Sequence, residues 1–407
     1  MSIYIINGGR PLFGSVRVSG SKNAALPILF AAITCEGRSR IHNMPQIGDV
    51  DSATCLLTEL GAKVTRAGDT VTVDSSSLVY KRPSDSLTAS LRASTYLIGA
   101  MLARFGRADI GAYGGCSFAP RPIDLHIYAM ERLGAKRVGD SLFLDNPRGA
   151  EITFPKPSVG ATANAMILAA SIEERTELFG CAVEPHILSL ADFLTSSGAK
   201  IYVEDRHISI RGAGLKAGEV TLVPDMIEAA TYHILSLLTG GNILVEGASY
   251  GELSCFLSPL EKSGIIVRKS DTGVCLCGKM QTTIDIVAEP FPGFPTDIAP
   301  LMAPLLAGCL GGHITDTVFP SRFGYLNSLS AFGLSYTRDK LGAAIYPSRF
   351  HSSSTAAPDL RGGMAAIILS LVAEGESIVN SADIVLRGYS DLTSKLLSLG
   401  ADVKFTK

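Results

Sequence analysis

The chain has 407 residues, of which 46% are hydrophobic and 18% are charged, and its formal net charge is −2. This composition predicts a folded protein with a large core and excludes intrinsic disorder. The small net charge gives no general attraction to nucleic acid or to an anionic membrane, so any anion site must be local. The length predicts two or three domains.

The start of the chain, Met1–Ile6, has no basic segment followed by a long apolar stretch, which argues against a signal peptide. The longest apolar runs, such as the one from Ala24 to Ile33, are shorter than the roughly 20 residues that cross a bilayer. We therefore expect a soluble, cytoplasmic protein that binds neither nucleic acid nor a membrane.

The eight cysteines are spread along the chain without the spacing of a disulfide framework. We expect most of them to be reduced and buried. Cys275 and Cys277 lie in an expected strand, and no second pair of Cys or His residues follows at ligand spacing. We predict no structural metal, and nothing in the sequence implies an organic cofactor.

An internal repeat organises the chain. Six apolar helical runs each lead to a second, amphipathic helix that ends near a glycine, and the units recur roughly every 65–70 residues. The glycines are Gly61, Gly134, Gly198, Gly264, Gly333 and Gly400. This period is longer than that of short solenoid repeats, so one repeat is predicted to be a small α/β unit.

The first repeat shows the expected order of elements. Val16 and Val18 alternate with polar residues, which predicts an opening strand. The segment Asn23–Cys35 is apolar on nearly every side, which is typical of a helix buried all round. A second helix follows and ends at Gly61, and Val71–Val73 belongs to a closing hairpin.

The later repeats supply five more helices that are apolar on all sides. They are expected at Leu91–Ala103, Ala161–Ser171, Glu228–Leu238, Thr296–Leu306 and Arg361–Val372. Helices buried on every face predict an α/β (α+β) fold with helices inside and sheets outside, the reverse of the usual layering.

Cationic residues recur at the ends of these elements. They are Lys22, Arg92, Arg121, Arg322, Arg361 and Arg387. Helix N-termini add exposed N–H groups and the positive end of the helix dipole. If these positions face one cleft, that cleft binds a multiply anionic ligand. The alternative is that each arginine caps a helix or bridges groups within its own lobe.

The segment Tyr113–His126 departs most from the repeat. Two glycines precede Cys116 and two prolines follow it, which predicts an exposed loop with a stiff base. Beside Arg121, such a cysteine can act as an acid or as a nucleophile. The alternative interpretation is a buried, inert cysteine.

The segments 20–27 and 114–126 closely resemble the UDP-N-acetylglucosamine enolpyruvyl transferases. Further matches follow in the family's order at 158–162, 224–228, 294–297, 322–323, 359–361 and 387–389. The resemblance covers essentially the whole chain. It implies a two-lobed inside-out α/β barrel with three repeated units in each lobe, which agrees with the six repeats.

The resemblance also implies where the chain passes between the lobes, near Gly20 and near Asp225. Residues 22–225 would form the lobe with the Cys116 loop, and residues 1–21 plus 226–407 would form the other. We expect the protein to be a monomer.

The implied reaction transfers the enolpyruvyl group of phosphoenolpyruvate to the 3-hydroxyl of UDP-N-acetylglucosamine and releases phosphate. It is the first committed step of peptidoglycan synthesis, and therefore serves cell wall biogenesis, cell shape and cell division. Such chemistry needs cations for the phosphate and the carboxylate, an acid for the methylene carbon and a base near the hydroxyl.

The family's functional residues map onto this chain by motif. Cys116 would be the acid, and it can also add covalently to the substrate; Asp297 would be the base. Asp359 and Arg361 would support the proton movements and the charge. Phosphoenolpyruvate would be held by Lys22, Arg92, Arg121 and Arg387, of which Lys22 and Arg387 also count as catalytic. The acceptor would contact Asn23, Arg121, Pro122, Ile123, Asp124, His126, Lys156, Ser158, Val159, Gly160, Asp297, Val318 and Arg322.

Several of these residues have a simpler interpretation. Asp297 is also a plausible carboxylate at a helix N-terminus, and Asn23 a plain polar group at another. His126 is compatible with a satisfied surface or core histidine. Lys156 is compatible with a solvated lysine, and Ser158–Gly160 with an ordinary turn.

The sequence departs from the family pattern at His186, Met226, Pro320–Ser321, Phe118–Pro120 and Ile384–Leu386. These departures leave phosphoenolpyruvate handling intact and open the question of the acceptor. A paralogue acting on another uridine nucleotide is the nearest alternative. A shikimate-3-phosphate enolpyruvyl transferase shares the fold but has no such cysteine loop. A further alternative is a catalytically silent nucleotide-binding paralogue. Such a protein would have no reason to keep all of Lys22, Arg92, Cys116, Arg121, Asp297, Asp359 and Arg387.

Overall fold

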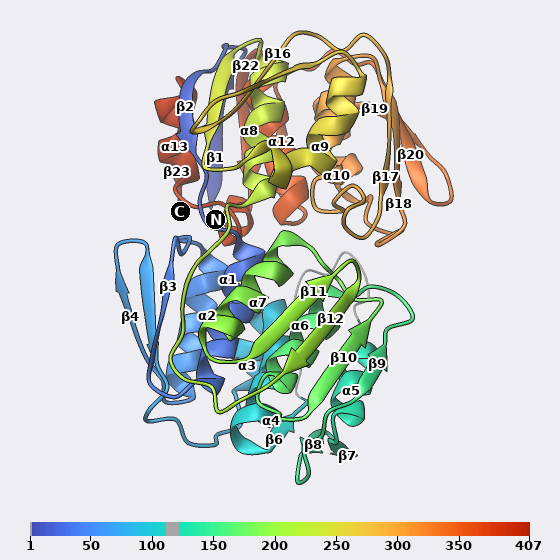
Figure 1. Ribbon diagram of the computed structural model, residues 1–407. Coiled ribbons are helices and arrows are strands. Elements are labelled where there is room, and N and C mark those ends of the chain that lie inside the picture. The colour runs from blue at the N-terminus through green and yellow to red at the C-terminus, as the bar shows by residue number, and fades with distance from the viewer. Residues whose placement is uncertain (1, 111–121) are drawn as a thin grey trace. The chain divides into compact units, whose positions relative to one another are not determined.

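The computed structural model describes residues 2–110 and 122–407 (Figure 1). The chain forms two compact units, one of Gly20–Val223 and one that joins the residues up to Ser19 with Pro224–Lys407. Gly20 and Ser21 belong to the first of these units because the Ser21 N–H donates to the Val223 carbonyl at 2.8 Å. The Asp225 N–H instead donates to the Ser19 carbonyl at 2.9 Å, within the other unit.

Among its described residues, the unit Gly20–Val223 has three buried helices at its centre, and α1 packs on α4 while α4 packs on α6. They are α1 (Lys22–Ala31), α4 (Leu97–Phe105) and α6 (Val159–Ala169). Most side chains of these helices are buried, as their largely apolar sequences predict. Two short 3₁₀ segments adjoin them, η1 (Ala32–Thr34) and η2 (Arg92–Tyr96).

The other helices of this unit are amphipathic and cover the buried ones. They are α2 (Gly48–Glu59), α3 (Asp85–Ser90), α5 (Asp124–Arg132) and α7 (Pro185–Ser196). In α7, for example, Ile187, Leu190 and Leu194 recur at helical spacing and are fully buried. An apolar face therefore seats α2, α5 and α7 on the central helices, whereas the short α3 packs on α2 and η2.

Sheets lie outside the helices of this unit. The first contains β3 (Arg38–His42), β4 (Lys63–Ala67), β5 (Thr70–Asp74) and β13 (Glu219–Thr221). The second contains β6 (Arg107–Asp109), β7 (Lys136–Val138) and β8 (Ser141–Phe143). The third contains β9 (Glu151–Thr153), β10 (Arg175–Phe179), β11 (Lys200–Glu204) and β12 (His207–Arg211). Figure 1 shows β11 and β12 covering α7 and α6, on which they pack.

The second unit repeats this plan. Its buried helices are α8 (Met226–Thr239), α10 (Ala299–Gly308) and α12 (Leu360–Val372), which pack on one another. Its covering helices are α9 (Tyr250–Lys262), α11 (Tyr325–Ser330) and α13 (Leu392–Ser398), with the 3₁₀ segment η3 (Ala382–Arg387). The prediction of helices inside and sheets outside is therefore confirmed for each unit.

The sheets of the second unit draw strands from both ends of the chain. One contains β1 (Ile3–Gly8), β21 (Ser354–Ala356), β22 (Gly375–Asn380) and β23 (Asp402–Thr406). Another contains β2 (Phe13–Arg17), β14 (Asn242–Glu246), β15 (Ile266–Lys269) and β16 (Gly273–Cys277). The third contains β17 (Ile284–Ala288), β18 (Gly312–Asp316), β19 (Ser335–Arg338) and β20 (Gly342–Tyr346).

The four-stranded sheets share one pairing pattern, in which a parallel pair is followed by an antiparallel hairpin. In the last repeat, β21 pairs in parallel with β22, and the hairpin partner of β23 is the N-terminal strand β1. Tyr4 and Ile6 of β1 are fully buried, so this strand is part of the core. The sixth repeat is thus completed by the first residues of the chain.

The glycine that follows each second helix has a structural reason. The six predicted positions all have a positive φ, between 91° and 115°. A residue with a side chain is strained in this left-handed region, whereas glycine is not. The recurring glycine is therefore required by the backbone at the point where the chain turns from helix to strand.

Three predictions about elements were wrong in detail. The strand around Val16 is not part of the first repeat, because β2 pairs in parallel with β14. The helix expected from Leu91 begins as the 3₁₀ segment η2, and the Ser94 N–H donates to the Leu91 carbonyl at 3.1 Å, the 3₁₀ spacing. The helix expected from Thr296 begins only at Ala299, with Pro300 in its first turn.

The cysteines are less buried than expected. Of those in the described ranges, Cys35 and Cys181 are buried, Cys55 is exposed and the other four are intermediate. Within the same ranges no three His, Cys, Asp or Glu side chains are grouped as metal ligands would be. No described helix combines the length and the apolar character that crossing a membrane requires.

Candidate active site

The two residues at the centre of the sequence hypothesis, Cys116 and Arg121, lie outside the described residues, so their roles stay predictions. The chain is described again from Pro122, which is exposed. Ile123 is the N-cap of α5, and Asp124 is its first residue, exposed to solvent. These positions therefore occupy the beginning of one amphipathic helix.

Lys22 is the first residue of α1 and Asn23 the second, and both are partly buried. The Lys22 Nζ lies 3.3 Å from the Asp49 Oδ2, and the lysine side chain is only 15% exposed. Asp49 belongs to the first turn of α2. The Asp49 carboxylate thus holds Lys22, which is predicted to bind phosphoenolpyruvate, at the start of α1. Asp49 was not among the residues predicted from the sequence. Arg92 stands at the start of η2, also partly buried.

Four predicted acceptor residues come together at the start of α6. Ser158 caps the helix by accepting the Ala161 N–H at 3.3 Å, and Val159 and Gly160 form its first turn. The His126 ring packs against this turn, because a Cβ placed on Gly160 would lie 2.8 Å from its Nε2. Ser158–Gly160 is therefore not an ordinary turn. Lys156 lies just before it and is exposed.

His126 is buried, with 5% of its surface exposed. Its Nδ1 lies 2.8 Å from the Nδ2 of Asn164, a residue in the middle of α6 that the sequence analysis missed. Burial lowers the pKa of His126 to about 4, and Arg92 acts in the same direction while Asp124 opposes it. The imidazole is thus neutral at physiological pH.

A second cluster lies within the unit that contains Pro224–Lys407. The Asp297 carboxylate lies 2.6 Å from Arg322 Nη1 through Oδ1 and 3.3 Å from Arg361 Nη2 through Oδ2. Both guanidinium groups are almost fully buried, whereas the Asp297 side chain is 28% exposed. The structure therefore brings three predicted residues together and leaves the carboxylate accessible between two buried cations.

Neighbouring side chains fix this cluster. The Thr296 hydroxyl donates to Asp316 Oδ2 at 2.6 Å, and Arg322 Nη1 donates to the Thr296 carbonyl at 3.2 Å. Asp316 also accepts the Val318 N–H at 2.9 Å, which places the partly buried Val318. Asp316 was missed by the sequence analysis, because only the fold brings it to Thr296.

Asp359 is the N-cap of α12, and its Oδ1 accepts the N–H groups of Arg361 and Gly362 at 2.9 and 3.0 Å. Asp359 thus caps α12, and this cap places Arg361 in the first turn of the helix. Burial works to lower the pKa of Arg361, but Asp297, together with Tyr389, raises it above the usual value. Arg387 ends η3 and is partly buried.

Of the departures from the family pattern, Phe118–Pro120 lies outside the described residues, and the others have defined places. His186 lies in the first turn of α7, Met226 begins α8, and Pro320 and Ser321 are exposed before α11. Two residues after Met226, the carboxylate of the buried Glu228 accepts hydrogen bonds from Lys395 Nζ at 2.6 Å and from the Ser19 N–H at 2.8 Å. Burial raises the pKa of Glu228, although Lys395 acts against this shift.

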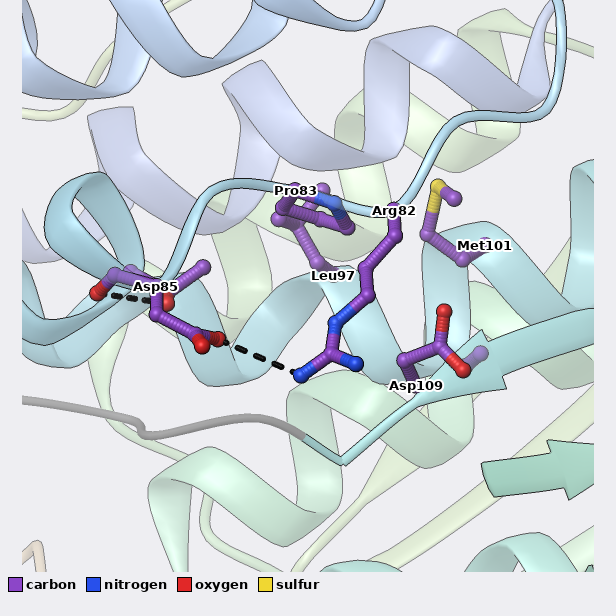
Figure 2. Close-up of a pocket in the computed structure, with 8 residues that line it drawn as sticks. Arg82, Pro83, Asp85, Leu97, Met101 and Asp109 are labelled. Carbon is purple, nitrogen blue, oxygen red and sulfur yellow. Dashed lines mark hydrogen bonds and ion pairs between the residues drawn. The ribbon is translucent and has the colours of Figure 1, made fainter. Parts of the chain in front are cut away.

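A small cavity lies beside the end of β6 in the unit Gly20–Val223 (Figure 2). Its volume is about 10 Å³, which is room for roughly one water molecule. Figure 2 shows the interaction between Arg82 and Asp85, two of the residues that line the cavity. Arg82 Nη2 lies 3.5 Å from Asp85 Oδ1, and Leu97 and Met101 also line the cavity. It is too small to hold a substrate.

Comparison with known proteins agrees with this geometry. Residues 6–396 match the family model described as EPSP synthase (3-phosphoshikimate 1-carboxyvinyltransferase). A protein of Halothermothrix orenii named UDP-N-acetylglucosamine 1-carboxyvinyltransferase is 36% identical, with 100% of each chain covered. The chain belongs to the enolpyruvyl transferase family.

Other relatives extend this result. A Caldanaerobacter subterraneus protein named UDP-N-acetylglucosamine 1-carboxyvinyltransferase 3 is 37% identical, with 99% of each chain covered. Among solved structures, the enolpyruvyl transferase NikO from Streptomyces tendae has a TM-score of 0.90 at 24% identity, covering 100% of this chain and 99% of its own. EPSP synthase from Acinetobacter baumannii has a TM-score of 0.75 at 16% identity, covering 100% of both chains. These two structures share the fold.

Proposed function

We propose that this chain transfers the enolpyruvyl group of phosphoenolpyruvate to the 3-hydroxyl of UDP-N-acetylglucosamine and releases phosphate. The observation that carries the proposal is the Asp297 cluster, in which two buried guanidinium groups hold one accessible carboxylate. Its full-length relatives carry the corresponding name. The product would serve peptidoglycan synthesis, and through it cell wall biogenesis, cell shape and division.

The reaction requires that a proton be added to the methylene carbon of phosphoenolpyruvate, which leaves cationic character on the adjacent carbon. The sugar oxygen forms a bond to that carbon and loses its proton, giving a tetrahedral ketal. The bond to the phosphate oxygen then breaks, a proton leaves the methyl carbon, and the double bond is restored. The first proton needs an acid and the hydroxyl proton needs a base.

In this proposal Asp297 accepts the hydroxyl proton, because its carboxylate is fixed at two oxygens and remains partly exposed. Cys116 delivers the proton to the methylene carbon. Lys22, held by Asp49, binds an anionic group of phosphoenolpyruvate together with Arg92, Arg121 and Arg387. Opposite charges in a partly buried site stabilise the developing phosphate without reorganisation.

The acceptor nucleotide is proposed to bind at the start of α6. The first turn of a helix presents N–H groups without intrahelical partners, and these groups bind anionic oxygens. Ser158, Val159 and Gly160 form that turn, and His126 lies against it. A uridine diphosphate offers oxygens of this kind. The enzyme is further proposed to be a cytoplasmic monomer.

The test is phosphate release from phosphoenolpyruvate, with UDP-N-acetylglucosamine, UDP, UMP or shikimate 3-phosphate offered as the acceptor. Release with UDP-N-acetylglucosamine alone is the expected result. Release only with another uridine nucleotide would favour the second candidate, a paralogue whose acceptor pocket is changed at His186, Met226 and Pro320. No release with any acceptor would mean a silent nucleotide-binding protein.

A further inference from the structure

Asn164 is a fully buried amide in the middle of the apolar helix α6. Its Oδ1 accepts the Gly99 N–H at 2.7 Å, from the neighbouring helix α4. Its Nδ2 donates to the Thr95 carbonyl at 3.0 Å and lies 2.8 Å from His126 Nδ1. One side chain thus connects α4, η2 and α5 to α6.

These partners leave the amide one orientation. A backbone N–H only donates and a backbone carbonyl only accepts, so Oδ1 must face Gly99 and the NH₂ group must face Thr95. The reversed amide would place an oxygen against the Thr95 carbonyl and two donors against each other at Gly99. A buried mismatch of this kind costs the full desolvation of both groups.

The orientation of Asn164 decides where His126 carries its proton. The Nδ2 group that faces His126 is a donor, so Nδ1 must accept and carries no hydrogen. In a neutral imidazole the hydrogen is then on Nε2. An imidazolium would instead point an Nδ1–H at the amide hydrogens, which opposes protonation. The charged groups that face the ring, Arg92 and Asp124, act in opposite directions, and burial dominates both.

The Nε2 edge of the ring lies against the start of α6. Nε2 and Cε1 lie 2.8 and 2.7 Å from the position of a Cβ on Gly160. Among the residues that the structure describes, Asn164 is the hydrogen-bond partner of this ring, and it engages Nδ1. The Nε2–H is therefore available to donate to a ligand, and it lies beside a helix turn whose N–H groups are also donors.

We propose that Asn164 is a positioning residue, which fixes His126 as a neutral Nε2–H donor to an acceptor oxygen of the nucleotide substrate. The inference rests on the proposed function, because it assigns a task within the proposed nucleotide site. Gly160 takes part by leaving room for the ring. Asn164 acts through His126 and does not itself touch the substrate.

The first test needs no substrate. In ¹⁵N-labelled wild-type protein at pH 7, long-range ¹H–¹⁵N spectra are expected to show His126 as the neutral form protonated at Nε2. Asn164→Asp is expected to move the ring toward an Nδ1-protonated or fully protonated state, because a carboxylate accepts where the amide donated. A wild-type ring that is protonated at Nδ1 would overturn the proposal.

The second test is kinetic. Asn164→Asp is expected to raise the KM for UDP-N-acetylglucosamine about 10- to 100-fold, the loss of one hydrogen bond to a charged acceptor. The KM for phosphoenolpyruvate and kcat are expected to stay within about threefold. In a His126→Ala background, Asn164→Asp is expected to add no further increase. An additive increase would overturn the proposal, because Asn164 would then act independently of His126.

Thr162→Val is the matched control, since Thr162 is another fully buried polar residue of α6 and accepts the Ala182 N–H at 3.1 Å. A general loosening of α6 would lower stability in both variants and change both KM values. If Asn164→Asp does not fold, Asn164→Ala replaces it, with a mixture of tautomers as the expected spectrum. If wild-type protein shows no turnover, the proposed function fails, while the tautomer spectra still decide the role of Asn164.

Discussion

Asp297 is the accessible member of a cluster whose other two members are buried. Arg322 and Arg361 are 4% and 2% exposed, and both form an ion pair with this carboxylate, which helps to compensate their buried charges. The sequence indicated Asp297 as a base, or alternatively as a helix N-terminal carboxylate. The second interpretation gave Asp297 a stabilising role through the helix dipole. Neither interpretation included its ion pairs with two buried arginines that are distant in sequence.

Asp297→Asn is expected to abolish phosphate release and also to lower the free energy of unfolding by about 3 kcal/mol, as removing one partner of a buried ion pair does. The measurement is urea unfolding beside the activity assay. Asp271→Asn, on an exposed turn, is the control and is expected to change neither. Lost activity at unchanged stability would mean that the arginines do not rely on Asp297.

The histidines make stability depend on pH. Burial lowers the pKa of His126 from 6.5 to about 4, so the unfolded chain binds the proton more readily than the folded one. The stabilisation is complete above pH 6.5 and is lost as the pH falls toward 4. The loss is about 3 kcal/mol for this residue. Burial also lowers the pKa of His233, to about 3.

Thermal unfolding between pH 7.5 and pH 4.5 measures this dependence. His126→Gln is expected to show a shallower fall in Tm over this range than the wild type, because the glutamine at position 126 takes up no proton on unfolding. His351→Gln, an exposed histidine, is expected to keep the wild-type slope. Equal slopes for all three proteins would exclude His126 as a source of acid lability.

Elements in this fold are joined by buried polar contacts as well as by apolar packing. Lys395 of α13 bonds Glu228 of α8 at 2.6 Å and the Ser19 hydroxyl, just after β2, at 2.8 Å. The sequence predicted these helices well from their apolar periodicity. It did not predict this junction, because the three residues are brought together only by the packing of elements from both ends of the chain.

Lys395→Met is expected to lower the free energy of unfolding by about 3–5 kcal/mol, because it leaves a buried carboxylate without its cation. Adding Glu228→Gln is expected to restore part of the loss, since a neutral amide is less costly to bury. Lys404→Met, on an exposed position of β23, is the matched control. The contact would be shown unimportant if the two substitutions were simply additive in unfolding experiments.

At the scale of the molecule, the repeat explains what sequence reading could and could not provide. The apolar helices and the glycine positions follow from local pattern, and α12 begins within one residue of its predicted start. Pairing between strands is not local. β1 and β2 stand next to each other in sequence but enter different sheets, and the sequence interpretation assigned β2 to the wrong repeat. Asn164 was visible as an amide in an apolar helix, yet its partners were not.

Tyr4→Ala tests the importance of the N-terminal strand. Tyr4 is fully buried in β1, and its hydroxyl lies 2.8 Å from that of Thr393. The substitution is expected to cost about 3–5 kcal/mol and to speed amide exchange in β22 and β23 together. Exchange in β3 and β5, within the unit Gly20–Val223, is expected to be unaffected. Val71→Ala in β5 should reverse this pattern.

The position of β1 between β22 and β23 has a consequence for how the chain is made. This strand is synthesised long before its two partners, at Gly375–Asn380 and Asp402–Thr406, with which it pairs. The contiguous segment Gly20–Val223 contains all the strands of its own sheets and can fold while synthesis continues. The residues of β1 therefore stay without these strand partners until both have been synthesised, and a chaperone that covers them in that period would favour correct assembly.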